Sequence, residues 1–165
     1  MATESKTGIA TTQVYEVYIK ASPQAIWDAI TSPEWTRKYG YQGPVEYGLH
    51  PGGAYKVRAT PEMLAMGIPE VILDGVVEEA DPPRKLVHTF RFLLPEAVKA
   101  EGFTRVTWEI EKVAAGFSRL SVTHELEGAP ITAGMVASKF SVEGTGGWGW
   151  ILSDLKSLLE TGCSM

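Results

Sequence analysis

The residues best suited to chemistry are two histidines that share strand faces with apolar side chains. In KLVHTFRF, His88 points the same way as Leu86 and Phe90, and in RLSVTHEL, His124 points the same way as Val122. Because histidine titrates near neutral pH, either ring could act as a general acid or base inside an apolar cavity. Most buried polar groups are paired within the fold, so a structural role in the core is the other interpretation of each histidine.

Aromatic residues extend this inward face. Trp108 lies on the same face of its segment as Val106, and Tyr55 lies on the same face as Val57. An apolar face with a few polar groups is typical of a small-molecule cavity. The residues expected to contact a ligand there are Trp35, Tyr39, Tyr41, Tyr55, Met63, Met66, His88, Phe90, Trp108, His124, Trp148 and Leu152.

Two loops supply part of that set, and each has a second interpretation. The stretch EWTRKYGYQG carries Trp35, Tyr39 and Tyr41, which could form the rim of a pocket or pack beneath a connection. The stretch TPEMLAMGIPE carries Met63 and Met66. Methionine adapts its shape to varied ligands, but a plain loop plug explains the two residues equally well.

Other kinds of site are not indicated. No H-x-x-H or H-E-x-x-H spacing occurs and His50 lies in a turn sequence, so neither a metal nor another cofactor is expected. The sequence lacks G-x-S-x-G, a Walker motif and a Cys/His pair, and Cys163 is its only cysteine. A net charge of -5 without a basic run argues against nucleic acid as a partner.

The sequence also contains no signal for a membrane. No stretch approaches the roughly 18 apolar residues of a membrane span. The N-terminal sequence MATESKTGIATTQ lacks the apolar run of a signal peptide. We therefore expect a cytoplasmic protein without a membrane partner, present as a monomer or a homodimer.

A glycine-rich stretch resembles a nucleotide-binding motif. Residues 144–149, GTGGWG, fit G-x-G-x-x-G letter for letter. That motif needs a strand before it, a helix after it and an acid about 20 residues later, and only the helix is indicated here. We expect the glycines instead to let the chain turn and to let the following helix lie close against the sheet.

Segments in which apolar and polar residues alternate, separated by turn sequences, predict the strands that position these residues. Strand-like runs start at QVYEVYIK, where Tyr15, Val17 and Ile19 share the buried face, and continue to about residue 126. The turns HPGG, DPPR and AAG separate neighbouring runs, and such short connections favour antiparallel pairing. The connection LLPEAVKAEGF is longer and could be a lid.

Three helices are predicted. One follows Ser22 and Pro23, and a second short one follows Ser32 and Pro33, because serine caps helices and proline fits their first turn. The third covers GGWGWILSDLKSLLETG and ends at Gly162. Its apolar stripe contains Trp148, Ile151, Leu152, Leu155, Leu158 and Leu159, whereas Ser153, Asp154, Lys156, Ser157 and Glu160 are assigned to the opposite side. Residues 13–162 are expected to form one domain, with tails at 1–12 and 163–165.

The pattern as a whole resembles the START-like (SRPBCC) superfamily, and within it the branch named after the activator of the heat-shock-protein ATPase. The resemblance rests on VYIKASPQAIWDAITSPEWTRKY, GGAYKV, GVVEEADPPRKLVHTF, VTWEIE and GWGWILSDLKSLLETG. It implies an α+β helix-grip fold, in which a curved antiparallel sheet surrounds a long C-terminal helix and two short helices close one end. The cavity between sheet and long helix commonly holds a hydrophobic small molecule.

The resemblance leaves several functions open. The chain could bind an aromatic or polyketide-like molecule without transforming it, or it could be a cyclase-like or aromatase-like enzyme that uses His88 or His124. Similar proteins also include self-sacrificing resistance proteins for enediyne antibiotics such as calicheamicin. Activation of a chaperone ATPase, or binding of another protein, is the fourth possibility. Fold analogy alone does not choose among these.

Overall fold

One antiparallel sheet forms the body of the protein. The computed structural model describes residues 11–137 and 146–165. The strands are β1 (Thr12–Ile19), β2 (Val45–Tyr47), β3 (Ala54–Arg58), β4 (Val71–Asp81), β5 (Lys85–Phe92), β6 (Thr104–Ala114) and β7 (Phe117–Glu125). They lie in the order β1-β7-β6-β5-β4-β3-β2, so the sheet is open, with β1 and β2 at its edges.

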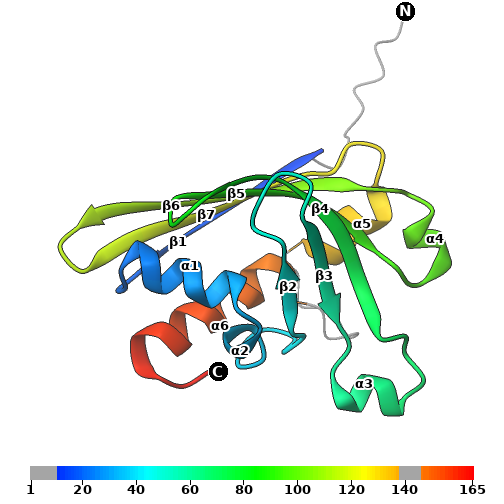
Figure 1. Cartoon of the computed structure of the whole chain (residues 1–165), viewed down its shortest axis with the longest axis horizontal. Coiled ribbons are helices and arrows are strands. Elements are labelled where there is room, and N and C mark those ends of the chain that lie inside the picture. The colour runs from blue at the N-terminus through cyan, green and yellow to red at the C-terminus, as the bar shows by residue number, and fades with distance from the viewer. Residues whose placement is uncertain (1–10, 138–145) are drawn as a thin grey trace, which may run out of the picture.

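The described helices lie beside or at the ends of this sheet. They are α1 (Pro23–Thr31), α2 (Pro33–Thr36), α3 (Pro61–Ala65), α4 (Glu96–Lys99), α5 (Pro130–Val136) and α6 (Gly147–Thr161). The two longest, α1 and α6, lie under the same face of the curved sheet (Figure 1). This arrangement is the helix-grip fold, which confirms the expected fold class.

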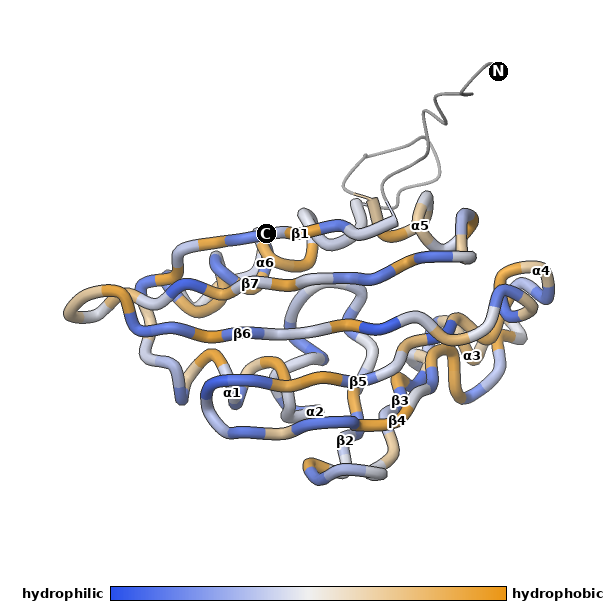
Figure 2. Tube along the Cα trace, turned by 90° about the horizontal axis from the view of Figure 1, so that it is seen from above, coloured by the Kyte–Doolittle hydropathy of each residue, from blue (hydrophilic) through white to orange (hydrophobic). Residues whose placement is uncertain are grey.

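Alternation along the strands decides which side chains face the helices. Hydrophilic and hydrophobic residues alternate along several strands (Figure 2). On β1, Tyr15, Val17 and Ile19 face inward as expected. On the central strands His88 and His124 are both fully buried. The strand pattern therefore places the polar rings in the core, as the sequence predicts.

The hairpin turns also lie where the sequence predicts. β2 pairs with β3 so that Tyr47 stands directly opposite Tyr55. β6 and β7 pair up to Ala114 and Phe117, around a glycine at position 116 with a left-handed backbone. Glycine adopts that conformation at no steric cost, which permits the tight turn.

The first two helices begin at the expected positions. Ser22 caps α1, because its Oγ accepts a hydrogen bond from the backbone amide of Ala25 at 3.1 Å. Ser32 occupies the same position before α2, but its side chain makes no capping bond. α1 directs Ile26, Trp27 and Ile30 into the core.

Helix α6 differs from the expectation at one residue. Gly162 ends the helix in a left-handed conformation, and Trp148, Leu152 and Leu155 are buried as predicted. The assignment of Asp154 to the solvent side was wrong, since its side chain is only 3% exposed. It is buried because its carboxylate accepts backbone hydrogen bonds from Gly40 and Met165.

Gly147, the first residue of α6, has a left-handed backbone with φ of 58°, as expected of a glycine that lets the chain turn. A Cβ atom on Gly147 would lie 2.3 Å from the carbonyl oxygen of Val136, so this glycine lets the start of α6 lie close to the end of α5. That the glycines bring the helix close to the sheet stays a prediction. Gly144, the first glycine of the GTGGWG stretch, lies outside the described residues. Most of the expected N-terminal tail, residues 1–12, lies outside them as well.

Three short helices were not anticipated. α3 lies in the methionine-containing stretch, α4 in the long connection after β5, and α5 between β7 and α6. Each has four to seven residues, too few for a helical repeat of apolar residues to be recognisable. In the residues that the structure describes, no helix is long and apolar enough to cross a membrane.

Candidate functional site

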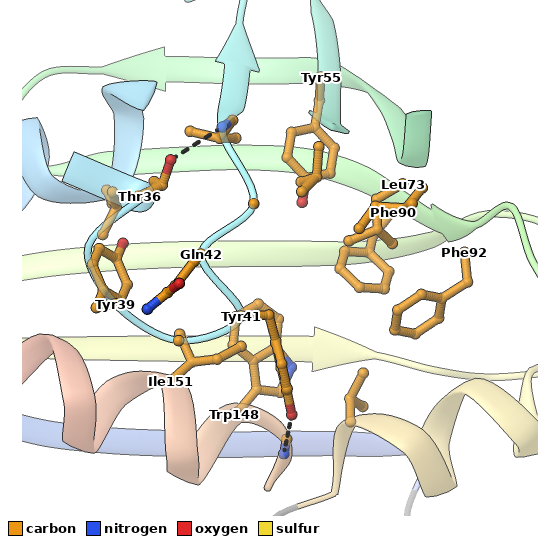
Figure 3. Close-up of a pocket in the computed structure, with 18 of the residues that line it drawn as sticks. Thr36, Tyr39, Tyr41, Gln42, Tyr55, Leu73, Phe90, Phe92, Trp148 and Ile151 are labelled. Carbon is orange, nitrogen blue, oxygen red and sulfur yellow. Dashed lines mark hydrogen bonds between the residues drawn. The ribbon is translucent and has the colours of Figure 1, made fainter. Parts of the chain in front are cut away.

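A cavity of about 300 Å³ lies between the sheet and α6. Its wall is formed by the inner face of the sheet, the loop after α2, and the first turns of α6 (Figure 3). The described residues that line it are Ile30, Thr36, Tyr39, Gly40, Tyr41, Gln42, Gly43, Val45, Tyr47, Tyr55, Val57, Met63, Ile72, Leu73, Phe90, Phe92, Trp108, Met135, Val136, Gly147, Trp148 and Ile151.

The loop after α2 brings Tyr41 and Gln42 to the cavity. Both residues are exposed, and the Tyr41 hydroxyl accepts a hydrogen bond from the backbone amide of Gly147 at 3.2 Å. Gln42 has a left-handed backbone, with φ of 62°, which is uncommon for a residue other than glycine. The tyrosine therefore connects this loop to the start of α6.

A second set of hydrogen bonds fixes the base of that loop. The hydroxyl of Tyr39 donates to the carbonyl oxygen of Ala29 at 2.9 Å, and the backbone amide of Val45 donates to Thr36 Oγ1 at 3.1 Å. Both side chains line the cavity. Burial raises the pKa of Tyr39 well above its ordinary value, so its hydroxyl stays protonated.

The ring of His88 lies behind the aromatic wall and is fully paired. Its Nδ1 lies 2.8 Å from the carbonyl oxygen of Thr89, which can only accept, so Nδ1 carries the proton. Its Nε2 accepts from the indole N–H of Trp108 at 3.1 Å and lies 3.3 Å from the Tyr47 hydroxyl. These contacts fix one neutral tautomer of His88.

His124 is paired in the opposite tautomer. Its Nδ1 accepts from the indole N–H of Trp148 at 3.1 Å. The Thr104 hydroxyl donates to the carbonyl oxygen of Phe90 at 3.0 Å, so its oxygen accepts from His124 Nε2 at 2.7 Å. A chain of hydrogen bonds thus runs from α6 through β7 and β6 to β5.

Both histidines are held in the neutral form. Burial lowers the pKa of His88 to about 4, although its hydrogen bond to the Thr89 carbonyl acts in the opposite direction. Burial, with a smaller contribution from His88, lowers the pKa of His124 to about 3. Neither ring lines the cavity, and neither has a nitrogen left to exchange a proton with a ligand there.

Tyr55 has the only phenol among the buried tyrosines of the described chain that lacks a hydrogen-bond partner. Its side chain is 5% exposed, and its hydroxyl end points into the cavity (Figure 3). In the described residues, every fully enclosed side-chain nitrogen or oxygen has a partner. The unpaired Tyr55 oxygen is therefore an atom that the open cavity reaches.

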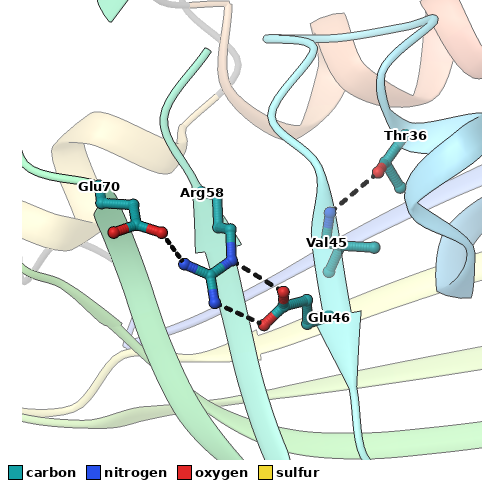
Figure 4. A network of polar contacts seen from close by, with 5 residues as sticks. All are labelled: Thr36, Val45, Glu46, Arg58 and Glu70. Atoms are coloured by element: carbon teal, nitrogen blue, oxygen red, sulfur yellow. Dashed lines mark hydrogen bonds and ion pairs between the residues drawn. The ribbon is translucent and has the colours of Figure 1, made fainter. Parts of the chain in front are cut away.

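The described part of the cavity wall carries no formal charge. No acidic or basic side chain is among the described residues that line it. The nearby ion pairs lie outside it: Arg58 forms salt bridges to Glu46 at 2.8 Å and to Glu70 at 2.6 Å (Figure 4). In the described chain, no cluster of three potential metal ligands occurs.

The structure brings part of the expected ligand set to this cavity. Tyr39, Tyr41, Tyr55, Met63, Phe90, Trp108 and Trp148 line it. The remaining five lie elsewhere: His88, His124 and Leu152 are buried behind the wall, Met66 is 77% exposed, and Trp35 is half-buried on α2. Whether any of the twelve contacts a ligand stays a prediction.

Sequence reasoning missed several lining residues. Tyr47 and Gln42 are two polar examples, and Leu73 and Phe92 are two apolar ones. Tyr47 could have been found from its register, because it stands opposite Tyr55 across a recognisable hairpin. Nothing in the sequence indicated that Gln42 would line the cavity, since it lies in a loop whose path depends on tertiary contacts.

Residues 20–160 match the family described as Activator of Hsp90 ATPase homolog 1-like protein. The chain belongs to this family. No curated protein matches the chain by sequence. The family assignment agrees with the helix-grip fold.

Solved structures similar to this family member share its fold at low sequence identity. A protein of Mesorhizobium loti has a TM-score of 0.66 at 18% identity, covering 90% of this chain and 96% of that one. The Aha1 dimer of Colwellia psychrerythraea has a TM-score of 0.61 at 19% identity, covering 92% and 97%. DynU16, a protein of the dynemicin biosynthetic locus, has a TM-score of 0.60 at 18% identity. That match covers 93% of this chain but only 49% of DynU16.

Proposed function

We propose that this protein binds a hydrophobic, aromatic or polyketide-like small molecule in the cavity between the sheet and α6. The observation that supports this most directly is the cavity itself, about 300 Å³ and walled largely by aromatic and aliphatic side chains. That volume is at the lower end of the range of about 300–1,000 Å³ for small-molecule pockets. It suits a small polycyclic ligand.

The pairing of the histidines favours binding over acid–base catalysis. A general base must reach the proton that it removes, directly or through one water. The nitrogens of His88 and His124 are all engaged with protein groups and lie behind the cavity wall. A cyclase-like reaction through either histidine would first have to break a buried hydrogen bond.

The comparisons guide the choice of ligands and of assembly state. DynU16 belongs to the dynemicin biosynthetic locus, so products of natural-product loci are suitable candidates for a ligand screen. The Colwellia protein is a dimer, and we propose a monomer or homodimer here, to be distinguished by sedimentation velocity. Native mass spectrometry of freshly purified protein would show a ligand retained from the cell.

A cavity-filling substitution tests the proposed function. Leu73 is half-buried, lies on β4 and lines the cavity (Figure 3), whereas Val76 on the same strand is 44% exposed and does not line it. The probe is fluorene, a neutral tricyclic hydrocarbon, at about ten times its dissociation constant. We expect it to stabilise the wild-type protein and Val76→Trp by about 1.4 kcal/mol, a rise in Tm of a few degrees. Leu73→Trp should lose this shift.

Two results would contradict the proposal. One is the absence of any fluorene-induced shift in the wild-type protein up to the solubility limit. The other is an equal shift in Leu73→Trp, which would place fluorene outside the cavity.

A further inference from the structure

The Tyr55 side chain is held by its neighbours so that only its hydroxyl remains available. Its ring stacks on Tyr47 with 4.9 Å between centroids and lies 4.1 Å from the ring of His88. It also lies 6.4 Å from the ring of Phe90. Rings packed in this way do not reorient freely, so the hydroxyl has a fixed position in the cavity.

The Tyr55 hydroxyl can donate a hydrogen bond, but no protein group in the described chain accepts it. A ligand that fills the cavity displaces water from this hydroxyl, so the hydroxyl then loses a hydrogen bond unless the ligand supplies an acceptor. Burial raises the pKa of Tyr55 well above its ordinary value, so the group remains a donor at physiological pH. A ligand that brings an acceptor to this oxygen recovers the lost hydrogen bond, whereas a pure hydrocarbon leaves it unmade.

The absence of charged side chains from the described wall determines which charge state of a ligand is favoured. An ionised ligand placed in the cavity would lose hydration without meeting an opposite charge, since no acidic or basic side chain lines the described wall. Desolvating an unpaired ion is far more costly than desolvating a neutral polar group. The described part of the wall therefore disfavours carboxylates, phosphates and amines.

We propose that the ligand is a neutral aromatic ketone or a related carbonyl compound whose oxygen accepts a hydrogen bond from the Tyr55 hydroxyl. This inference rests on the proposed binding function and specifies the chemical class of the ligand. Tyr55 is the residue that selects the carbonyl, and the aromatic wall supplies the contact area.

Three matched probes test the inference by isothermal titration calorimetry: fluorene, 9-fluorenone and 9-fluorenone-4-carboxylate. They share one ring system and differ in the carbonyl oxygen and in charge. We expect wild-type protein to bind fluorenone about 2–10-fold more tightly than fluorene, the worth of one neutral hydrogen bond. The carboxylate should bind at least about tenfold more weakly than fluorenone.

Two variants separate the hydroxyl from the ring. Tyr55→Phe should bind fluorene as the wild type does but lose the preference for fluorenone. Tyr15→Phe is the control, because Tyr15 lies on β1, does not line the cavity and donates its hydroxyl to Gln13. It should keep the wild-type preference.

The outcomes distinguish this inference from the proposed function. Equal binding of fluorene and fluorenone to the wild type, or a preference that survives in Tyr55→Phe, overturns the role of Tyr55 and leaves the binding function standing. Tight binding of the carboxylate overturns the selection for neutral ligands. If none of the three probes binds, both the binding function and the inference are wrong.

Discussion

The carboxylate of Asp154 accepts a hydrogen bond from the backbone amide of Gly40, with 2.8 Å between Oδ2 and the nitrogen. Asp154 lies on α6, and Gly40 lies in the loop that brings Tyr41 and Gln42 to the cavity. The bond joins parts of the chain separated by 114 positions. It therefore fixes the distance between the loop after α2 and helix α6, which together close one side of the cavity.

Removing this carboxylate should destabilise the protein and loosen the loop. We expect Asp154→Ala to lower the free energy of unfolding by about 1–3 kcal/mol, because the amide of Gly40 loses its acceptor in a partly buried setting. Urea denaturation would measure the loss. Asp28→Ala is the control, since Asp28 is exposed on α1 and its side chain accepts a hydrogen bond from the neighbouring Gln24. An Asp154→Ala protein as stable as this control would contradict the anchoring role.

Removing the hydroxyl of Thr104 should lower the free energy of unfolding by about as much as removing the Asp154 carboxylate. Thr104→Val keeps the shape but leaves His124 Nε2 without its acceptor, so we expect a loss of about 1–3 kcal/mol in the free energy of unfolding. Thr107→Val, on the same strand but half-buried, should change it by less than about 0.5 kcal/mol. Equal effects of the two substitutions, measured by chemical denaturation, would show that the hydrogen-bond chain contributes nothing specific.

The buried histidines should make the protein acid-sensitive. Both pKa values are lowered in the folded state, to about 4 for His88 and about 3 for His124, whereas an unfolded histidine titrates near 6.5. The unfolded chain therefore binds more protons below about pH 6.5. The stability that the neutral rings provide is complete above that pH and is lost as the pH falls towards 4 for His88 and 3 for His124.

One variant isolates the contribution of His88. Between pH 7 and pH 4.5, a single histidine shifted in this way accounts for a fall of about 2–3 kcal/mol in the free energy of unfolding. His88→Gln should be less stable at pH 7 but should lose less stability over this interval than the wild type. His50→Gln, at an exposed position, should keep the wild-type profile. A parallel profile for His88→Gln would mean that His88 does not titrate on unfolding.

The salt bridges of Arg58 should matter for local order more than for global stability. Arg58 forms salt bridges to Glu46 on β2 and to Glu70, which directly precedes β4 (Figure 4). The three side chains are partly or largely exposed. Exposed pairs contribute about 0–1 kcal/mol each, so Arg58→Met should change the unfolding free energy little. Hydrogen exchange in residues 59–70 should become faster. Arg84→Met, which breaks a local pair with Asp81, should leave that exchange unchanged.

Much of the fold could be predicted from local rules. Period-two alternation identified the inward faces that contain His88, Trp108 and His124, because a strand allows only two sides. The capping residue Ser22 and the terminal Gly162 located two helix ends through local backbone chemistry. These features depend on residues close together in the sequence.

The site was less predictable because it depends on contacts between distant segments. Asp154 reads as a solvent-facing residue on a helical wheel, and only the loop around Gly40 makes its burial favourable. The alternation placed both histidines inward but could not show that Trp108 and Trp148 occupy their nitrogens. The short helix α3 begins with a local cap, in which the Thr60 side chain accepts from the amide of Met63, but its five residues are too few to show an apolar repeat.

The aromatic wall also gives the protein an optical property. Two of its five tryptophans, Trp108 and Trp148, line the cavity, with 5.3 Å between their ring centroids. A conjugated ligand that enters must come into van der Waals contact with the wall that they form. Its arrival should quench or shift indole emission, so the purified, unlabelled protein can report its own occupancy when a compound library is screened.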